Sequence, residues 1–427
     1  MKKGLLLGAG FSYDLGMPLS YDLTEVFFSF FNNKNIGQFA FALAKNNPFG
    51  EGRSINKHAI VEGLDLLLRY KLNKCSNYEE YLSNLIRLGY TSGKNQSDRD
   101  SYHYLFSEFY QSIHTILSVY QKVSYQLMYR ENFKWFSKLE NLLSTEETWV
   151  FTLNHDIYLE CLAIDLGIPV TYGDTESISF PLSNLEMSNK VDLTYSVRSK
   201  LTIDSPKYFK GRKGINLVKL HGGLSELSYK DRTIICNPKL DKCTSLDLIE
   251  AFKNIENMAY YHQGMRVPSG KDRFITNSSG ELDIMTKSML TGGKKYSKTS
   301  NPKKGEEKLK LFDDVLQQLD ELTIIGYGFA DSHINFRIAN AMVLNKNICI
   351  KIIDPINNQI PECLAQFDYD SRIRKAICSV AHWMDYCKSQ KCNLEQINSL
   401  KENAKYRIQV KETVAEVFRE ESIFNWQ

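Results

Sequence analysis

The stretch Lys3-Gly4-Leu5-Leu6-Leu7-Gly8-Ala9-Gly10-Phe11-Ser12 decides the fold that this sequence predicts. Its first half is typical of a short apolar strand, its second half of a turn almost free of side chains, and a helix is expected to follow. Glycines let a backbone approach a phosphate closely, and the first N–H groups of a helix offer donors and partial positive charge. The turn therefore predicts a phosphate site formed by Gly8, Ala9, Gly10, Phe11 and Ser12.

The turn differs from the usual dinucleotide fingerprint of dehydrogenases, which has a third glycine where this chain has Tyr13. The sequence thus favours a nucleotide ligand but not a dehydrogenase. An ordinary tight turn between a strand and a helix is the alternative, because short motifs often match by chance.

Composition and charge limit the class of protein. The chain has 427 residues, of which 43% are hydrophobic and 24% charged, as in ordinary globular proteins. The apolar run at residues 4–7 is too short for a secretory signal, and no later run approaches the ~18 apolar residues of a membrane span. We expect a cytoplasmic protein that does not bind membranes. A net charge of +3 gives no reason to expect direct nucleic-acid binding.

The cysteines do not predict a metal site. There are nine, at positions 75, 161, 236, 243, 349, 363, 378, 387 and 392, and no two form a C-x-x-C pair. This spacing argues against a four-cysteine zinc site and favours free thiols. Cys387, Cys392 and His382 are close in sequence, but their spacing is not that of a metal centre, so no metal is expected.

A lysine-rich stretch lies at residues 287–310. Its default interpretation is a solvated loop, with a phosphate or partner contact as the alternative. Seven of its lysines stand close together: Lys294, Lys295, Lys298, Lys303, Lys304, Lys308 and Lys310.

The rest of the chain predicts an α/β architecture. Further apolar strands are expected at 148–152, 168–170, 215–220, 322–325 and 348–353. Apolar strands that alternate with helices indicate a doubly wound parallel sheet covered on both faces. We predict one α/β domain over 1–370 that is interrupted by a helical insertion at about 54–144 and has hairpins or irregular loops at 172–214, followed by a C-terminal helical segment at 371–427.

Unusual residues follow four of these further strands, all except the one at 168–170, and the ends of strands are where ligands bind in parallel sheets. Asn154-His155-Asp156 follows the second strand, and His221 precedes two glycines after a later one. A second glycine turn, Gly326-Tyr327-Gly328, and finally Asp354 follow the last two strands.

Taken together, these motifs resemble the sirtuin-like superfamily of NAD-consuming proteins. Gly8 to Ser12 is similar to its G-A-G-x-S turn, Leu153 to Asp156 to its Q-N-x-D motif, and His221-Gly222 to its catalytic H-G. The segment Gly326 to Asn335 resembles G-Y-S-F-x-D-x-H-I-N of the bacterial branch, which is associated with anti-phage defence. The resemblance covers positions 1 to about 50 and 145 to about 360 in scattered blocks. It implies a Rossmann-like sheet.

Two departures from protein-deacylating sirtuins are informative. Those enzymes carry G-I-P-D-F-R after the first turn, where this chain has Gly16 to Tyr21, and they carry a four-cysteine zinc ribbon that this chain lacks. Both argue against a peptide deacylase. The resemblance then implies an NAD hydrolase that releases nicotinamide and ADP-ribose and depletes NAD in defence, with NAD as substrate and without a metal.

The resemblance also implies roles for individual residues. Asn154 is expected to bind ribose hydroxyls or a water, Asp156 to orient the nicotinamide amide or stabilise the developing cation, and His221 to act as general base. The two glycine turns, including Tyr327, are expected to hold the diphosphate, and Asp354 the adenosine end. Structural alternatives remain: a helix cap for Asn154 or Asp331, a core histidine at His221, and a turn at Asp354.

The alternatives for the whole protein are a sensor that binds NAD or ADP-ribose without turnover, and an NAD-dependent deacylase. Resemblance alone implies the partners, namely a homo-oligomer and a HerA-type DNA-translocating ATPase. The sequence does not indicate the activating trigger.

Overall fold

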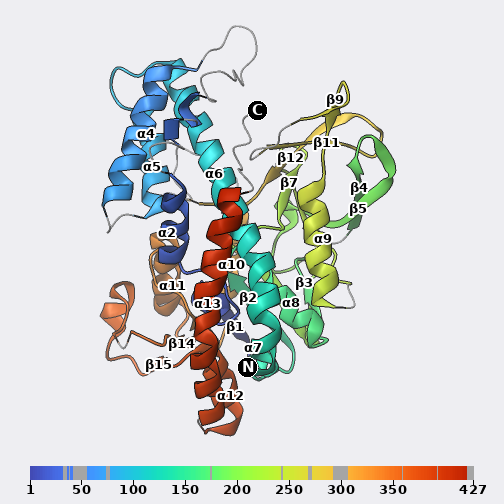
Figure 1. Ribbon diagram of the computed structural model, residues 1–427. Coiled ribbons are helices and arrows are strands. Elements are labelled where there is room, and N and C mark those ends of the chain that lie inside the picture. The colour runs from blue at the N-terminus through green and yellow to red at the C-terminus, as the bar shows by residue number, and fades with distance from the viewer. Residues whose placement is uncertain are drawn as a thin grey trace.

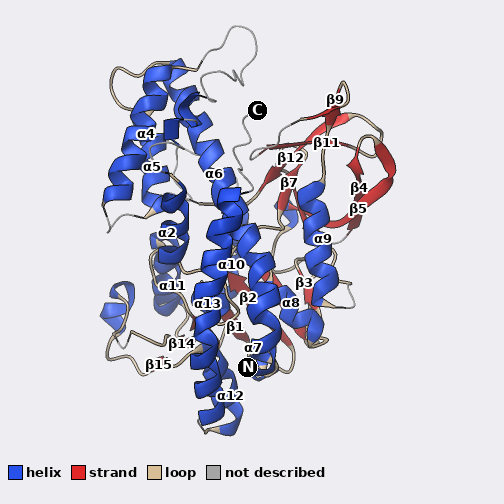
Figure 2. Ribbon diagram, viewed as in Figure 1, coloured by secondary structure: helices blue, strands red, loops and turns tan. Residues whose placement is uncertain are grey.

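The computed structural model describes residues 1–31, 36–37, 39–41, 55–73, 77–173, 176–241, 244–267, 272–291, 306–357, 359–391 and 393–420. Figures 1 and 2 show its helices and strands. The α-helices of this part of the chain are α1 (Gly10–Tyr13), α2 (Ser20–Phe30), α4 (Lys57–Leu72), α5 (Tyr78–Leu88), α6 (Gln96–Ser124), α7 (Arg130–Phe136), α8 (Tyr158–Asp165), α9 (Ser245–Asn257), α10 (Glu306–Leu316), α11 (Ser332–Leu344), α12 (Val380–Ser389) and α13 (Leu394–Glu420). None of them combines the length and apolar character that crossing a bilayer requires.

A parallel sheet of seven strands forms the centre of the molecule, which confirms the predicted α/β class. Its strand order is β15-β14-β13-β1-β2-β6-β3, and every neighbouring pair is parallel. The strands are β1 (Lys3–Leu7), β2 (Glu147–Thr152), β3 (Val170–Thr171), β6 (Gly214–Lys219), β13 (Glu321–Ile325), β14 (Cys349–Ile353) and β15 (Ile373–Ala376).

The strand order reverses at β1. The chain runs from β1 to β2 on one side, and later returns to place β13 on the other side. In open α/β sheets such a reversal leaves a crevice at the carboxyl ends of the two strands, because the following loops turn away in opposite directions. The first glycine turn and the turn at Gly326 lie at this position.

The register places the candidate residues along one edge of the sheet. Leu7 at the end of β1 pairs with Thr152 of β2 and with Ile325 of β13. Thr152 in turn pairs with Lys219 of β6, and Ile325 with Ile353 of β14. Every candidate motif begins within two residues of this line, so the predicted gathering at the strand ends is confirmed.

Both faces of the sheet are covered. Leu5 and Leu7 of β1 face a large core that includes residues of α2, α4, α5, α6, α8, α9, α12 and α13. Leu6 points to the opposite face and joins a core built with α10 and α11. Because successive residues of a strand alternate in direction, an apolar run such as Leu5 to Leu7 is stable only between two such layers.

A second, antiparallel sheet was predicted only in part. The hairpin expected within 172–214 is present as β4 (Glu176–Ser183) and β5 (Glu186–Val197), and pairs over most of its length. The six-stranded sheet that contains it, in the order β11-β12-β7-β8-β5-β4, was not predicted. Its other strands are β7 (Leu227–Tyr229), β8 (Ile234–Pro238), β11 (Asp272–Thr276) and β12 (Leu282–Lys287), and a separate pair is formed by β9 (Tyr261–His262) and β10 (Met265–Arg266). This sheet lies at the upper right of Figure 2.

The helical insertion predicted at about 54–144 contains α4 to α7, and the helical segment predicted at 371–427 contains α12 and α13. A π-helical turn at Tyr125–Tyr129 joins α6 to α7, and short 3₁₀ turns follow at Leu139–Leu142, Arg198–Lys200 and Glu362–Phe367. α13 crosses the molecule beside α6 (Figure 1) and buries Val410 and Val414. The segment from 371 onward is not entirely helical, because β15 within it is the seventh strand of the parallel sheet.

Candidate functional site

The two glycine turns pack directly against each other. A Cβ at Gly8 would lie 2.5 Å from the carbonyl oxygen of Gly326, and a Cβ at Gly10 would lie 2.7 Å from the Cα of Gly326. Gly326 itself has φ +63, and a Cβ there would lie 2.5 Å from the Gly10 backbone. All three positions therefore require glycine for the close approach of β1 and β13, whether or not a ligand binds.

Most amides of the first turn are already paired within the protein. The Gly8 N–H donates to Ile325 at 2.9 Å, the Gly10 N–H to Gly326 at 2.9 Å, and the Phe11 N–H to Gly8 at 2.9 Å. These amides are therefore not the free donors that the sequence led us to expect, and α1 is only four residues long. Ala9 is exposed at the tip of the turn. Phosphate binding by Gly8 to Ser12 stays a prediction.

Ser12, Asn154 and Asp156 meet at the ends of β1 and β2. The Asn154 side chain donates from Nδ2 to the Ser12 hydroxyl at 3.3 Å. Helix α8 has Ile157 as its N-cap, so the helix-cap alternative for Asn154 is wrong. Asp156 instead serves the helix start, since its Oδ1 accepts the Tyr158 N–H at 3.0 Å.

The Asp156 carboxyl group is buried, and burial raises its pKa above the usual value for aspartate. Hydrogen bonds from the Tyr158 amide and the Ser12 hydroxyl, together with the nearby Lys219, partly oppose this increase. A buried carboxylate held by such donors can stabilise a developing positive charge, because the surrounding low dielectric strengthens their interaction.

Lys219 is a buried residue of this site that the sequence analysis did not identify. Its Nζ lies 2.6 Å from Glu160 Oε1, and it donates to the Asp156 carbonyl oxygen at 3.1 Å. The pair is almost completely buried, with both side chains 1% exposed. A lysine within an apolar strand was the signal that could have revealed it, because a buried lysine requires a partner.

His221 lies at the end of β6 and is 1% exposed. Its Nε2 is 3.2 Å from the Nε2 of His333, which comes from the first turn of α11. The next residue, Gly222, has φ +65, and a Cβ there would lie 2.1 Å from the Ser288 carbonyl oxygen. The glycine after His221 is thus required for the loop to pass the end of β12. His333 was quoted in the sequence motif, but it was not predicted as a site residue.

Tyr327 and Asn335 fix the loop that carries His333. The Tyr327 hydroxyl donates to Asn335 Oδ1 at 2.9 Å, and Asn335 Nδ2 donates to the Phe329 carbonyl oxygen at 2.8 Å. Tyr327 is buried, whereas Gly328 is exposed. Asp331 is the N-cap of α11, but its carboxylate makes no capping hydrogen bond.

Asp354 follows β14 and forms a turn. Its Oδ1 accepts the N–H groups of Ile356 at 2.8 Å and Asn357 at 2.9 Å. The turn alternative for Asp354 is therefore correct, and its contact with adenosine stays a prediction. β14 is separated from β1 by β13, so Asp354 lies two strands, about 10 Å, from the first glycine turn.

The lysine-rich stretch is in part a structural element. Lys308 lies in α10, where it is buried, and its Nζ is 2.7 Å from both oxygens of Glu226 and 2.8 Å from the Lys219 carbonyl oxygen. A solvated loop is therefore the wrong interpretation for this residue. Lys310 is exposed, and Lys294, Lys295, Lys298, Lys303 and Lys304 lie outside the described residues.

A groove of about 1310 Å³ lies elsewhere, between α2 and α13. Tyr21, Glu25, Arg407 and Lys411 are among its lining residues, and none of the predicted site residues lines it. Its charges of both signs already pair across it, since Lys411 bonds to Asp22 and Glu25. The groove therefore gives no reason to move the candidate site away from the strand ends.

Comparison with known proteins does not identify a family. No protein-family model matches the chain, and its sequence matches no curated protein. The resemblance therefore rests on the short sequence motifs alone.

Proposed function

We propose that this protein is an NAD hydrolase of the sirtuin-like kind, with its site at the carboxyl ends of β1, β2, β6 and β13. The observation that carries the proposal is the meeting of Ser12, Asn154 and Asp156 at the strand-order reversal, one strand away from His221. A nucleotide site is expected at this position of a parallel sheet. The Rossmann-like identity of the sheet is part of the proposal.

The reaction needs little acid assistance. The bond between the ribose C1′ and the nicotinamide nitrogen breaks, and its electron pair neutralises the positive ring. A water oxygen then bonds to C1′ and gives up a proton, so the products are nicotinamide, ADP-ribose and one proton. Because the transition state is oxocarbenium-like, the protein has to hold the ribose, stabilise positive charge and accept that proton.

The candidate residues suit these tasks. Asn154 offers amide groups to ribose hydroxyls or to the water, and the Asp156 carboxylate offers negative charge in a buried setting. His221 is the base that accepts the proton, because a neutral imidazole offers a nitrogen lone pair. Asn154 and Asp156 are each 8% exposed.

The proposal includes the expected partners. The assay is therefore designed with and without a HerA-type ATPase, and as a function of protein concentration to detect a homo-oligomer. Depletion of NAD during phage infection is the cellular role that the resemblance implies.

The test is nicotinamide release from NAD by the purified full chain, beside Asn154→Ala and His221→Ala. We expect each variant to lose at least ~100-fold in kcat/KM, because each removes a group that acts in the transition state. The matched controls are Asn189→Ala and His262→Ala, which are exposed residues of the antiparallel strands. Circular dichroism checks that every variant is folded.

Three outcomes would overturn the hydrolase proposal. Wild-type protein that binds NAD in calorimetry but releases no nicotinamide, with or without partner, would favour the sensor. Formation of acetyl-ADP-ribose from an acetylated peptide would favour a deacylase. Equal activity in wild type, Asn154→Ala and His221→Ala would place the chemistry elsewhere.

A further inference from the structure

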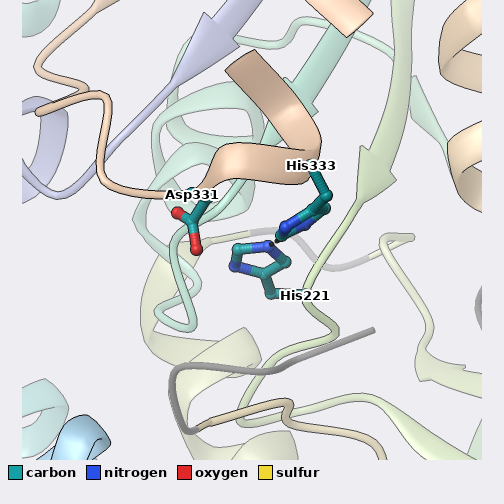
Figure 3. A group of neighbouring side chains, drawn as sticks. All are labelled: His221, Asp331 and His333. Atoms are coloured by element: carbon teal, nitrogen blue, oxygen red, sulfur yellow. Dashed lines mark hydrogen bonds between the residues drawn. The ribbon is translucent and has the colours of Figure 1, made fainter. Parts of the chain in front are cut away.

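His221, Asp331 and His333 form a compact group of possible metal ligands. One ligand atom from each lies within 4.8 Å of the other two. Figure 3 shows the two imidazole rings facing each other, with the Asp331 carboxylate directed toward them. The group joins the end of β6 to the start of α11, across 112 residues of sequence.

The distance between the two histidines fits shared coordination. Two imidazole nitrogens bound to one tetrahedral zinc at ~2.05 Å lie ~3.3 Å apart. The observed distance between Nε2 of His221 and Nε2 of His333 is 3.2 Å. An imidazole pair without a metal can also be joined by one shared proton, so metal binding has to be measured directly.

The third ligand is placed to complete the group. Asp331 stands two residues before His333, and its carboxylate does not cap α11 although it is at the N-cap position. One ligand atom of Asp331 lies within 4.8 Å of a ring nitrogen of each histidine, close to the ~3.3 Å expected between two ligands of one ion.

The three side chains differ in exposure, as expected for a metal centre that keeps one position open to water. His221 is 1% exposed, whereas Asp331 and His333 are only partly buried. Two histidines and a carboxylate are typical ligands of Zn²⁺ and related divalent transition metals, and three protein ligands leave a position for water. Mg²⁺ and Ca²⁺ prefer oxygen ligands and are a poorer match.

We propose that His221, Asp331 and His333 bind one divalent transition-metal ion of the zinc class. Metal binding itself is independent of the proposed NAD hydrolysis. One consequence does rest on that function: an ion bound at Nε2 of His221 takes the lone pair that a base requires. The site would then make the hydrolase sensitive to inhibition by zinc.

The test measures metal binding to the full chain in the absence of NAD. The apoprotein is titrated with Co²⁺, whose visible absorption reports tetrahedral or five-coordinate nitrogen and oxygen ligation, and with Zn²⁺ against a chromophoric chelator. We expect one ion per chain. His221→Ala, Asp331→Ala and His333→Ala are each expected to weaken binding at least ~10-fold, as loss of a metal ligand or its support does.

The controls separate this site from other metal ligands of the chain. His58→Ala changes an exposed histidine of α4 and should bind metal like the wild type. A sulfur-to-cobalt charge-transfer band in the near ultraviolet would reveal binding by cysteines instead. Far-ultraviolet circular dichroism confirms that the three ligand variants fold.

The outcomes also distinguish this proposal from the previous one. No cobalt spectrum with the wild type, or unchanged affinity in all three folded ligand variants, would overturn the metal site whatever the NAD assay shows. Specific metal binding by a protein that releases no nicotinamide even when it is assayed free of metal, with or without the partner, would leave the metal site standing and remove the hydrolase. Nicotinamide release that Zn²⁺ does not inhibit at saturation would overturn the inhibitory consequence.

Discussion

Single atoms decide how the two glycine turns fit together. The hydrogen on the Gly326 Cα faces the Gly10 backbone, and the backbone at Gly326 has φ +63. A sequence motif alone would assign both glycines to a phosphate, but here their absent side chains also allow β1 and β13 to end side by side. A substitution at these positions can therefore change the stability of the fold as well as ligand binding, and the two effects have to be measured separately.

Gly326→Ala should destabilise the fold by about 2–4 kcal/mol, because it adds a Cβ to a left-handed backbone and a close backbone contact. Denaturant unfolding measures this. Gly328→Ala is the matched control, since a Cβ there meets nothing within 4 Å, and it should change stability by less than about 0.5 kcal/mol. If Gly326→Ala unfolds like the wild type and only loses ligand, the packing explanation fails.

Ser12→Ala should shift the pH dependence of the proposed hydrolysis. The Ser12 hydroxyl hydrogen bond lowers the pKa of Asp156, so its removal raises that pKa. The acid limb of kcat/KM should then move to higher pH, if ionised Asp156 is required. Ser29→Ala, an exposed serine of α2, is the control. An unshifted limb in the active variant would show that ionisation of Asp156 does not govern the rate.

At the scale of elements, α6 holds the carboxyl group of Glu108 in a setting that disfavours its ionised form. Burial raises the pKa of Glu108 from 4.5 to about 7. Because the folded-state pKa is above the unfolded one, the contribution of Glu108 to stability is fully present below about pH 4.5 and is lost as the pH rises through about 7.

Glu108→Gln should therefore stabilise the protein at about pH 8, by about 1–3 kcal/mol, and much less at about pH 5. Thermal or urea unfolding at both pH values measures the difference. Glu250→Gln on the exposed face of α9 is the control and should show no such dependence. Equal effects of Glu108→Gln at both pH values would contradict the raised pKa.

At the scale of the whole molecule, a buried ion pair joins the two sheets. Lys308 from α10 contacts the Lys219 carbonyl oxygen at the end of β6 and the Glu226 carboxylate just before β7. Burial lowers the pKa of Lys308, which the Glu226 charge opposes. The charged pair is favourable only while both members are present.

Lys308→Met should cost about 3–5 kcal/mol of stability, because it leaves the Glu226 carboxylate buried without this partner. The double variant Lys308→Met with Glu226→Leu should regain most of that loss, since it removes both charges. Denaturant unfolding of the wild type and of the single and double variants measures these changes in stability. A double variant no more stable than Lys308→Met would show that the pair has another role.

The sequence by itself determined the central sheet and the edge at which the candidate residues gather. Apolar strands and glycine turns are local patterns, and parallel strands that end in register bring their following loops to one edge. Leu5 to Leu7 needed two covering layers, and Asn154, Asp156 and His221 each had to follow a strand. These features required no knowledge of distant contacts.

Only the tertiary structure decided which of these residues touch. It placed His333 beside His221, packed Gly326 on Gly10, buried Lys308 and assembled the antiparallel sheet from strands spread over residues 176–287. Each of these depends on pairing between segments far apart in the chain, and local propensity carries no information about such pairing. The physical reason is that packing and charge pairing select which side chains become neighbours. These interactions form only when distant segments of the chain come together in the folded state.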